Sequence, residues 1–144
     1  MTNAFKDGPQ YRNSVTCALS VGTDTQLSLL CEKARHKPMV VQNRCYAALG
    51  WDKEVRDLCR EHRIVYQGFS LLTANREVFT EPDVRAMAVK YGTGLAQIVF
   101  RFAMQIGMLP LTGTTNPEHM KEDLASDQFT LTAEELQRIE TIGL

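Results

Sequence analysis

Residues 108–124 read MLPLTGTTNPEHMKEDL, a short apolar run that enters a loop of threonine and glycine and then a helix. Asn116 is a residue type that caps helix N-termini, Pro117 suits the first helical position, and Glu118 falls in the positively charged first turn. The loop 112–115 offers free backbone N–H groups and three hydroxyls, so it is typical of a strand-to-helix connection that holds a phosphate. An ordinary connection in an α/β protein has a similar pattern and stays open as the alternative.

Strands and helices alternate along the rest of the chain. Buried strands are predicted at four apolar runs, residues 14–21, 39–43, 64–69 and 109–111. Helical patterns follow each strand, at residues 27–34, 51–62, 82–91 with 95–106, and 116–125. Thr132 and Glu135 form a capping box that starts a last helix. This alternation predicts an α/β fold with a parallel sheet covered by helices on its outside.

In such a sheet, ligands bind beyond the carboxyl ends of the strands. The residues just after the predicted strands are Ser20 and Val21, Gln42 and Asn43, Phe69 and Ser70, and the loop 112–115. Four strand-helix units amount to half of an eight-stranded barrel, which leaves two strand edges to be covered.

Composition narrows the class of protein. With 144 residues and 44% hydrophobic content, the chain is long enough for one domain. Lys plus Arg number 16 and Asp plus Glu 17, giving a net charge of -1 without a charged block, so nucleic acid is not an expected partner. The absence of a leader pattern and of a long apolar run predicts a cytoplasmic protein that does not enter membranes. The four cysteines and three histidines lack metal-ligand spacing, so no metal is expected.

From residue 14 onward, the chain resembles the C-terminal half of the aldo/keto reductases. LSVGTDTQL (19–27) is similar to the family's fifth-strand segment GVSNFxxxQL, and KPMVVQNRCY (37–46) to KPxVNQxxxH. HRIVYQGFSLL (62–72) resembles GIxVxAYSPL, and residues 90–124 resemble KHGxTxAQVxLRWxxQxGxxxIPKSTNPERIKENL. The resemblance implies a partial (half) TIM (β/α)8 barrel in residues 14–144: four parallel βα units plus a C-terminal helix. Residues 1–13 are an unmatched N-terminal segment.

The resemblance also implies a nicotinamide dinucleotide, NAD(P)H, as cofactor. Ser20 and Gln42 match the family residues that hold the nicotinamide carboxamide, whereas the neighbouring Asn of the family is Val21 here. Phe69 stands where a Tyr stacks on the nicotinamide, and its ring can preserve stacking without the hydroxyl. Two further matches lie on the pyrophosphate side, Ser70 and Leu72.

Further cofactor-binding positions follow at the adenine end of the implied site. In chain order they are Gly113, Thr114, Thr115, His119, Glu122 and Asp123. Gly113 replaces the family's Lys, and His119 replaces the Arg that covers adenine and the 2′-phosphate. Because charge-assisted hydrogen bonds are the stronger ones, we expect weak NAD(P)H binding with little preference for the 2′-phosphate.

The family's catalytic tetrad of Asp, Tyr, Lys and His comes from the first half of the barrel, so no catalytic residue is predicted here. Asp7 and Tyr11 imitate the Asp–Tyr pair, but they stand four residues apart where the family has five. The leading interpretation is a truncated protein or pseudoenzyme with part of the cofactor site. One alternative is an assembly module, as a half-barrel homodimer or complemented by a partner half-barrel. The other is an active aldehyde or ketone reductase with a non-standard proton donor, Tyr11 or Tyr46.

Overall fold

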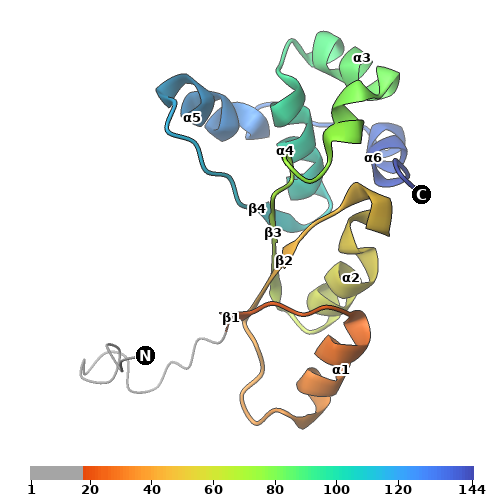
Figure 1. Cartoon of the computed structure of the whole chain (residues 1–144), viewed down its shortest axis with the longest axis vertical. Helices are drawn as coiled ribbons and strands as arrows, with labels where there is room; N and C mark the ends of the chain where they lie inside the picture. The colour runs from red at the N-terminus through yellow and green to blue at the C-terminus, as the bar shows by residue number, and fades with distance from the viewer. Residues whose placement is uncertain (1–17) are drawn as a thin grey trace.

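The structure, a computed structural model, describes residues 18–144. Its strands form one parallel sheet in the order β1-β2-β3-β4 (Figure 1). The strands are β1 (Ala18–Leu19), β2 (Val40–Arg44), β3 (Val65–Phe69) and β4 (Met108–Pro110). The order of strands in space equals their order in the chain, as the alternation of strands and helices predicts.

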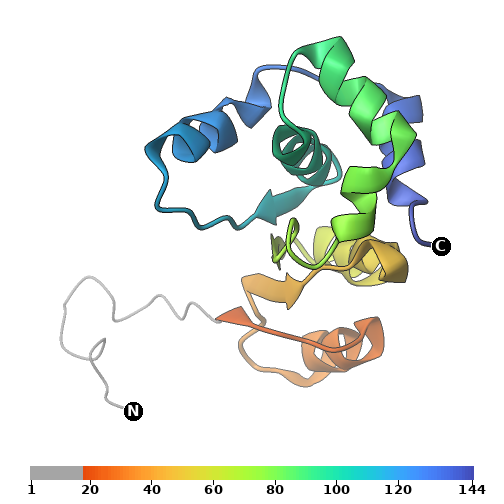
Figure 2. The ribbon, with the colours of Figure 1, turned by 45° about the horizontal axis from the view of Figure 1, so that its top comes forward.

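Helical segments connect the strands and follow the last one. They are α1 (Asp24–Lys33), η2 (Ala47–Asp52), α2 (Lys53–Glu61), η3 (Arg76–Thr80), α3 (Pro82–Tyr91), α4 (Leu95–Gln105), α5 (Pro117–Leu124), η4 (Ala125–Asp127) and α6 (Ala133–Glu140). Helices α2 and α4 lie against β3 and β4, and α6 contacts α3, α4 and η2 (Figure 2). None of these helices is long and apolar enough to cross a bilayer, as far as residues 18–144 are concerned.

Helix ends follow the capping signals in the sequence. The Asn116 side chain accepts a hydrogen bond from the Glu118 N–H at 3.0 Å, and Pro117 is the first residue of α5. Thr132 and Glu135 form the predicted capping box of α6. Gly92 ends α3 with φ of 64°, a conformation that glycine adopts without steric cost. Each of these local predictions is confirmed.

The core lies between the sheet and the helices. Leu27, Val41 and Trp51 are fully buried in it, together with Phe102. The rings of Trp51 and Phe102 meet edge to face with centroids 4.9 Å apart, and the Trp51 Nε1–H donates to the Ile139 carbonyl at 3.0 Å. Burial of these two aromatic side chains helps to hold η2, α4 and α6 together.

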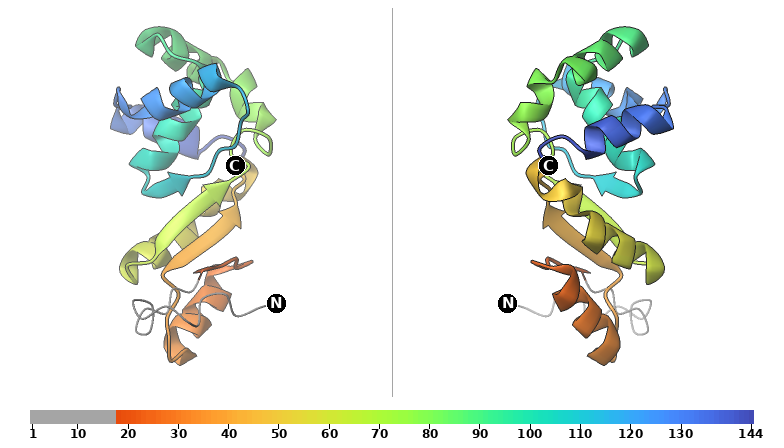
Figure 3. Two further views of the ribbon diagram at one scale, coloured as in Figure 1. Left: turned by 90° about the vertical axis from the view of Figure 1, so that its left-hand side faces the viewer. Right: turned by 90° about the vertical axis from the view of Figure 1, so that its right-hand side faces the viewer.

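No helix or strand of residues 18–144 covers the opposite face of the sheet. Because strand residues alternate between faces, Gln42 and Arg44 point to this inner side and are exposed, whereas Asn43 between them is buried. Val65 and Leu109 are each 48% exposed on the same side. In a complete barrel this face would be packed against side chains from the other strands. The described residues therefore form half of a barrel, with its inner face uncovered (Figure 3).

Several predicted boundaries are corrected by the structure. The strand expected at 14–21 ends at Leu19, because β1 has ladder partners only at Ala18 and Leu19 among the described residues. The strand expected at 109–111 is shifted to Met108–Pro110. The predicted boundary at residue 13 and the pair Asp7 and Tyr11 lie outside the described residues.

The helix expected to start at residue 51 starts at Lys53 instead. The reason is a left-handed segment at Gly50, Trp51 and Asp52, whose φ values are 65°, 55° and 55°. Positive φ is uncommon for residues other than glycine, so local sequence rules do not anticipate it at Trp51 and Asp52. Because of this segment, the Trp51 side chain enters the core and the side chain of the next residue, Asp52, reaches β2 and β3.

Candidate functional site

A groove of about 550 Å³ lies at the carboxyl ends of the strands. It is lined by residues from all four strand-end connections, namely Ser20, Gln42, Phe69, Ser70, Leu111, Thr112 and Gly113. A smaller hollow of about 190 Å³ continues from Ser70 and Gly113 toward Leu72 and Phe100. Six of the eleven predicted site residues thus come together, although they are separated by up to ninety-odd positions in the sequence.

Gln42 and Phe69 give the groove two different surfaces. Gln42 is exposed near the end of β2, and its amide can both donate and accept hydrogen bonds. Phe69 ends β3 and is half-buried, so its ring offers a flat apolar surface to a ligand. Arg44 lies beside Phe69 in the strand register and adds a positive charge to the inner face, with its guanidinium 5.4 Å from the Tyr46 ring centre.

Ser20 is tied to a buried polar chain behind the groove. Its Oγ lies 3.1 Å from Asn43 Oδ1, which also accepts from the Val21 N–H at 3.0 Å. The Asn43 amide nitrogen donates to Asp52 Oδ2 at 2.8 Å. The Tyr66 hydroxyl donates to the same oxygen at 2.7 Å. Burial raises the pKa of Tyr66 well above its usual value, so this hydroxyl remains a donor.

Asn75 joins the two loops that follow β2 and β3. Its side chain is fully buried and accepts from the Ala47 N–H at 2.6 Å. Its amide nitrogen donates to the carbonyls of Cys45 and Leu71 at 3.0 Å and 2.8 Å. Every polar atom of this side chain is used, so the loops on both sides of Phe69 are held at a fixed separation.

The loop before α5 is held more loosely. The Thr112 hydroxyl donates to Asp123 at 2.9 Å, and Thr114 Oγ1 accepts from the Asn116 N–H at 3.1 Å. Among residues 18–144, the N–H groups of Gly113, Thr114 and Thr115 have no hydrogen-bond acceptor. A Cβ placed on Gly113 would meet no atom within 4 Å, so this part of the loop borders open space.

The remaining predicted residues lie on α5 or its approach. Thr114, Thr115, His119, Glu122 and Asp123 do not line the groove or its smaller continuation. His119 and Glu122 are exposed, and α5 has no buried residue. Asp123 reaches the groove only through its hydrogen bond with Thr112.

A contact between a tyrosine and a lysine occurs on the helical side instead. Lys90 Nζ is 3.2 Å from the Tyr91 hydroxyl, and both groups bond to the Glu135 carboxylate. Partial burial would raise the pKa of Glu135, but hydrogen bonds from Lys90, the Thr132 N–H and Tyr91 outweigh it and lower this pKa to about 2. These groups fasten α6 to the end of α3 and do not line the groove.

The described cysteines are reduced and buried. Burial raises the pKa of Cys45 to about 12 and that of Cys59 to about 11, so neither thiol is an activated nucleophile. Within residues 18–144, no group of three or more His, Cys, Asp or Glu side chains is arranged to hold a metal ion.

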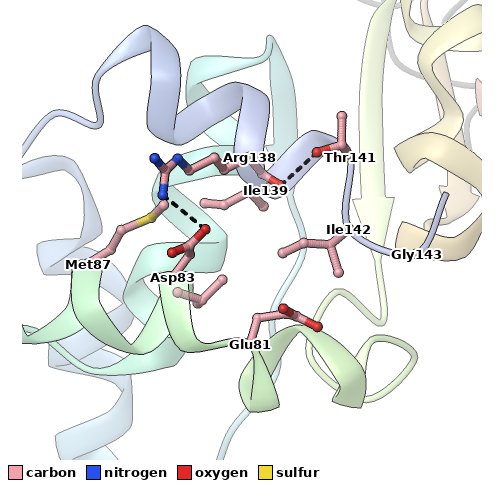
Figure 4. Close-up of a pocket in the computed structure, with 9 residues that line it drawn as sticks. Glu81, Asp83, Met87, Arg138, Ile139, Thr141, Ile142 and Gly143 are labelled. Atoms are coloured by element: carbon pink, nitrogen blue, oxygen red, sulfur yellow. Dashed lines mark hydrogen bonds and ion pairs between the residues drawn. The ribbon is translucent and has the colours of Figure 1, made fainter.

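A second cavity, of about 330 Å³, lies between α3 and the C-terminal segment (Figure 4). Asp83 and Arg138 form an ion pair of 3.0 Å across it, above an apolar floor that includes Met87 and Ile142. Both charged side chains are more than half exposed, so their pairing contributes little free energy. This cavity shares no residue with the groove at the strand ends.

The comparison with protein families decides the class of this chain. The model of the "Aldo/keto reductase family" matches residues 34–143. The chain belongs to the aldo/keto reductase family. The predicted membership is thereby confirmed.

Curated relatives in this family are considerably longer. The chain is 30% identical over 130 residues to aldo-keto reductase family 1 member D1 of Oryctolagus cuniculus, an alignment that covers 82% of this chain and 40% of the relative. It is 29% identical over 118 residues to an aldo-keto reductase of Mycolicibacterium paratuberculosis, covering 82% of this chain and 41% of that protein. The aldo/keto reductase chain described here thus spans about 40% of the length of these relatives.

Solved structures share the fold. Gox0644 in its apo form superposes with a TM-score of 0.78 at 22% identity, over 90% of this chain and 47% of that one. An aldo-keto reductase of Bombyx mori in complex with NADP gives a TM-score of 0.76 at 20% identity, over 87% of this chain and 43% of that one. The predicted half of a TIM barrel is confirmed.

Proposed function

We propose that this aldo/keto reductase chain binds a nicotinamide dinucleotide in the groove at its strand ends and retains only part of the family's NAD(P)(H) site. The observation that carries the proposal is the convergence of Ser20, Gln42, Phe69, Ser70 and Gly113, from all four strand ends, on one groove. The neighbour from Bombyx mori, which contains NADP, has the same fold. A ligand at the carboxyl ends of parallel strands is the general rule for such sheets.

The groove residues suit the parts of a dinucleotide. Phe69 offers a ring face to the nicotinamide, while Ser20 and Gln42 offer hydrogen bonds to its carboxamide. Ser70 and Leu72 border the continuation of the groove where the pyrophosphate would lie. The N–H groups of the loop 112–115 and the start of α5 are suited to phosphate oxygens.

Affinity is expected to be weak because the adenine end lacks fixed charge. Gly113 and His119 stand where the family resemblance places a Lys and an Arg. Lys121, also on α5, is paired with Glu118 at 3.2 Å. Without charge-assisted bonds to the 2′-phosphate, NADH and NADPH should bind about equally.

We also propose that the chain does not reduce carbonyl compounds by itself. Bound NAD(P)H would supply a hydride, but the carbonyl oxygen also needs a proton donor. Among residues 18–144, those that line the groove include no Tyr, Lys, His or Asp. The Tyr91 and Lys90 contact lies on the helical side, so it cannot serve this groove.

Titration of the full chain with NADH and NADPH, followed by nicotinamide fluorescence, tests the proposal. We expect saturable binding with dissociation constants within about threefold of each other. Saturation by neither ligand would overturn the proposed function, and a strong preference for NADPH would refute the inference from Gly113 and His119.

An assay of aldehyde-dependent NAD(P)H oxidation tests the second part. The expected rate equals that of a blank without protein. If turnover is seen, comparison with Tyr46→Phe shows whether Tyr46 is the donor, since this residue stands close to the inner face beside Arg44.

A second candidate function is assembly with another half-barrel. It is favoured by the exposed inner face, where Val65 and Leu109 are each 48% exposed, and by the free edges of β1 and β4 among the described residues. Light scattering on a sizing column distinguishes the cases: a discrete dimer supports a homodimer, and a monomer of 16.2 kDa argues against it.

A further inference from the structure

We propose that Asn43 is a positioning residue of this site: it takes up the proton of the Ser20 hydroxyl, so that Ser20 faces the groove as a hydrogen-bond acceptor for the N–H of a bound carboxamide. The inference rests on the proposed dinucleotide binding and deepens it. Asn43 itself is 6% exposed and does not line the groove. It can therefore act on a ligand only through the residues that it holds.

The orientation of the Asn43 amide follows from its partners. The Val21 N–H can only donate, and it lies 3.0 Å from Oδ1 of Asn43. The Asp52 carboxylate can only accept, and it lies 2.8 Å from Nδ2. A flipped amide would place oxygen against the carboxylate and nitrogen against the N–H. Both ends thus agree on one orientation, which settles an assignment that is otherwise open for Asn side chains.

The direction of the Ser20 hydroxyl bond follows in turn. Oδ1 of Asn43 has no hydrogen, so at 3.1 Å the Ser20 hydroxyl must donate to it. The proton of Ser20 is then committed to the buried side, and the lone pairs of Oγ remain for the groove that Ser20 lines. An N–H group, rather than a carbonyl oxygen, is the matching ligand group.

The far end of this chain of bonds is also fixed. The Tyr66 hydroxyl donates to Asp52 at 2.7 Å, and Tyr66 is 2% exposed in the core. Asp52 is held by a backbone in the left-handed region, φ 55°, directly before α2. Asn43 therefore cannot rotate without breaking bonds to two different elements, and the end of β1 is fixed beyond its two ladder pairs.

A test compares two ligands that differ in one group. The carboxamide of NADH has an N–H donor, whereas the reduced 3-acetylpyridine analogue has a methyl ketone with the carbonyl alone. We expect the wild-type chain to bind NADH about fivefold more tightly than the analogue, the size of one neutral hydrogen bond. Calorimetric titration measures both affinities with the full chain.

Variants then assign the preference to Asn43 and Ser20. Ser20→Ala and Asn43→Leu should each reduce the preference for NADH to about onefold. The double variant should bind NADH no more weakly than Ser20→Ala does, because Asn43 acts through Ser20. Thr132→Ala weakens the cap of α6, away from the groove, and serves as a control for general destabilisation that keeps the full preference.

Asp52→Gly is the second variant in case Asn43→Leu does not fold. Glycine fits the left-handed backbone at this position and removes the side-chain acceptor that orients Asn43, so the preference for NADH should again fall. Equal preference in wild type and in Asn43→Leu or Asp52→Gly, or additive losses in the double variant, would overturn the role of Asn43 while leaving dinucleotide binding intact. Failure of the wild type to bind either ligand would instead overturn the proposed function, and with it this inference.

Discussion

The two ends of the groove are built in different ways. At the nicotinamide end, Ser20 is held through Asn43 and Asp52, and Asn75 bonds the loops on either side of Phe69. At the adenine end, the loop 112–115 leaves N–H groups without acceptors in the described part of the chain, and α5 buries no residue. One end is therefore organised before a ligand arrives, while the other needs the ligand to order it.

This difference has an energetic consequence. Groups held in place beforehand lose little entropy when a ligand binds, whereas a loose loop loses more and returns less affinity. The half-barrel should thus obtain most of its dinucleotide affinity from the nicotinamide end. In the family pattern, a Lys and an Arg at the adenine end would offset the cost of ordering that region. Here Gly113 and His119 stand at those two positions.

The largest effect is expected from Asn75→Ala. It leaves the buried Ala47 N–H and the carbonyls of Cys45 and Leu71 without partners, so the free energy of unfolding should fall by about 3 kcal/mol. Urea denaturation measures it. The matched change at the other end, Thr114→Ala, should cost less than about 0.5 kcal/mol. Similar losses of unfolding free energy in Asn75→Ala and Thr114→Ala would contradict the proposed difference between the two ends of the groove.

Phe69→Ala should weaken NADH binding roughly tenfold, because the platform for the nicotinamide is removed. Fluorescence titration measures the affinity. Thr115→Ala at the adenine end should change it less than about twofold, since Thr115 is exposed and does not line the groove. A larger effect at Thr115 than at Phe69 would reverse the assignment of the two ends.

Gly113→Lys should create a preference for NADPH over NADH of about fivefold by restoring a charge for the 2′-phosphate. The site has room, because a Cβ on Gly113 meets nothing within 4 Å. The preference should shrink as salt is added. Gly113→Gln, similar in length but neutral, is the control, and an equal preference in both variants would rule out a charge effect.

The last expected effect concerns the acid stability of α6, which belongs to neither end. Since the pKa of Glu135 is lowered to about 2 in the folded chain, against an ordinary value of 4.5, it stabilises the fold above pH 4.5, and this contribution is lost as pH falls toward 2. Glu135→Gln should therefore flatten the acid limb of the unfolding curve, whereas Glu134→Gln should not. A parallel acid limb in Glu135→Gln and wild type would exclude this role.

Sequence patterns predicted the architecture well and the supports of the site less well. Alternating apolar runs and the caps at Asn116 and Thr132 are local signals, so the four βα units follow from them. The strand-end rule also singled out Asn43 beside Gln42. Its partner Asp52 was missed, because a left-handed residue between two helical segments has no recognisable pattern.

Asn75 and Tyr66 were missed for a related reason. Asn75 lies between the predicted strand 64–69 and the predicted helix 82–91, where the sequence predicts no strand or helix, and its importance comes from carbonyls 4 and 30 positions away. Tyr66 reads as an ordinary strand residue, and its bond to Asp52 depends on how α2 packs on β3. Long-range polar partners of this kind are fixed by packing, which spacing alone does not encode.

The burial of Trp51 gives the protein a built-in optical reporter. It is the chain's single tryptophan, fully enclosed by η2, α4 and α6 and hydrogen-bonded to Ile139. Its emission should sit at short wavelength in the native chain and move to longer wavelength when water reaches the indole. Each variant above can thus be checked for correct folding in the cuvette that holds the dinucleotide titration, without a label.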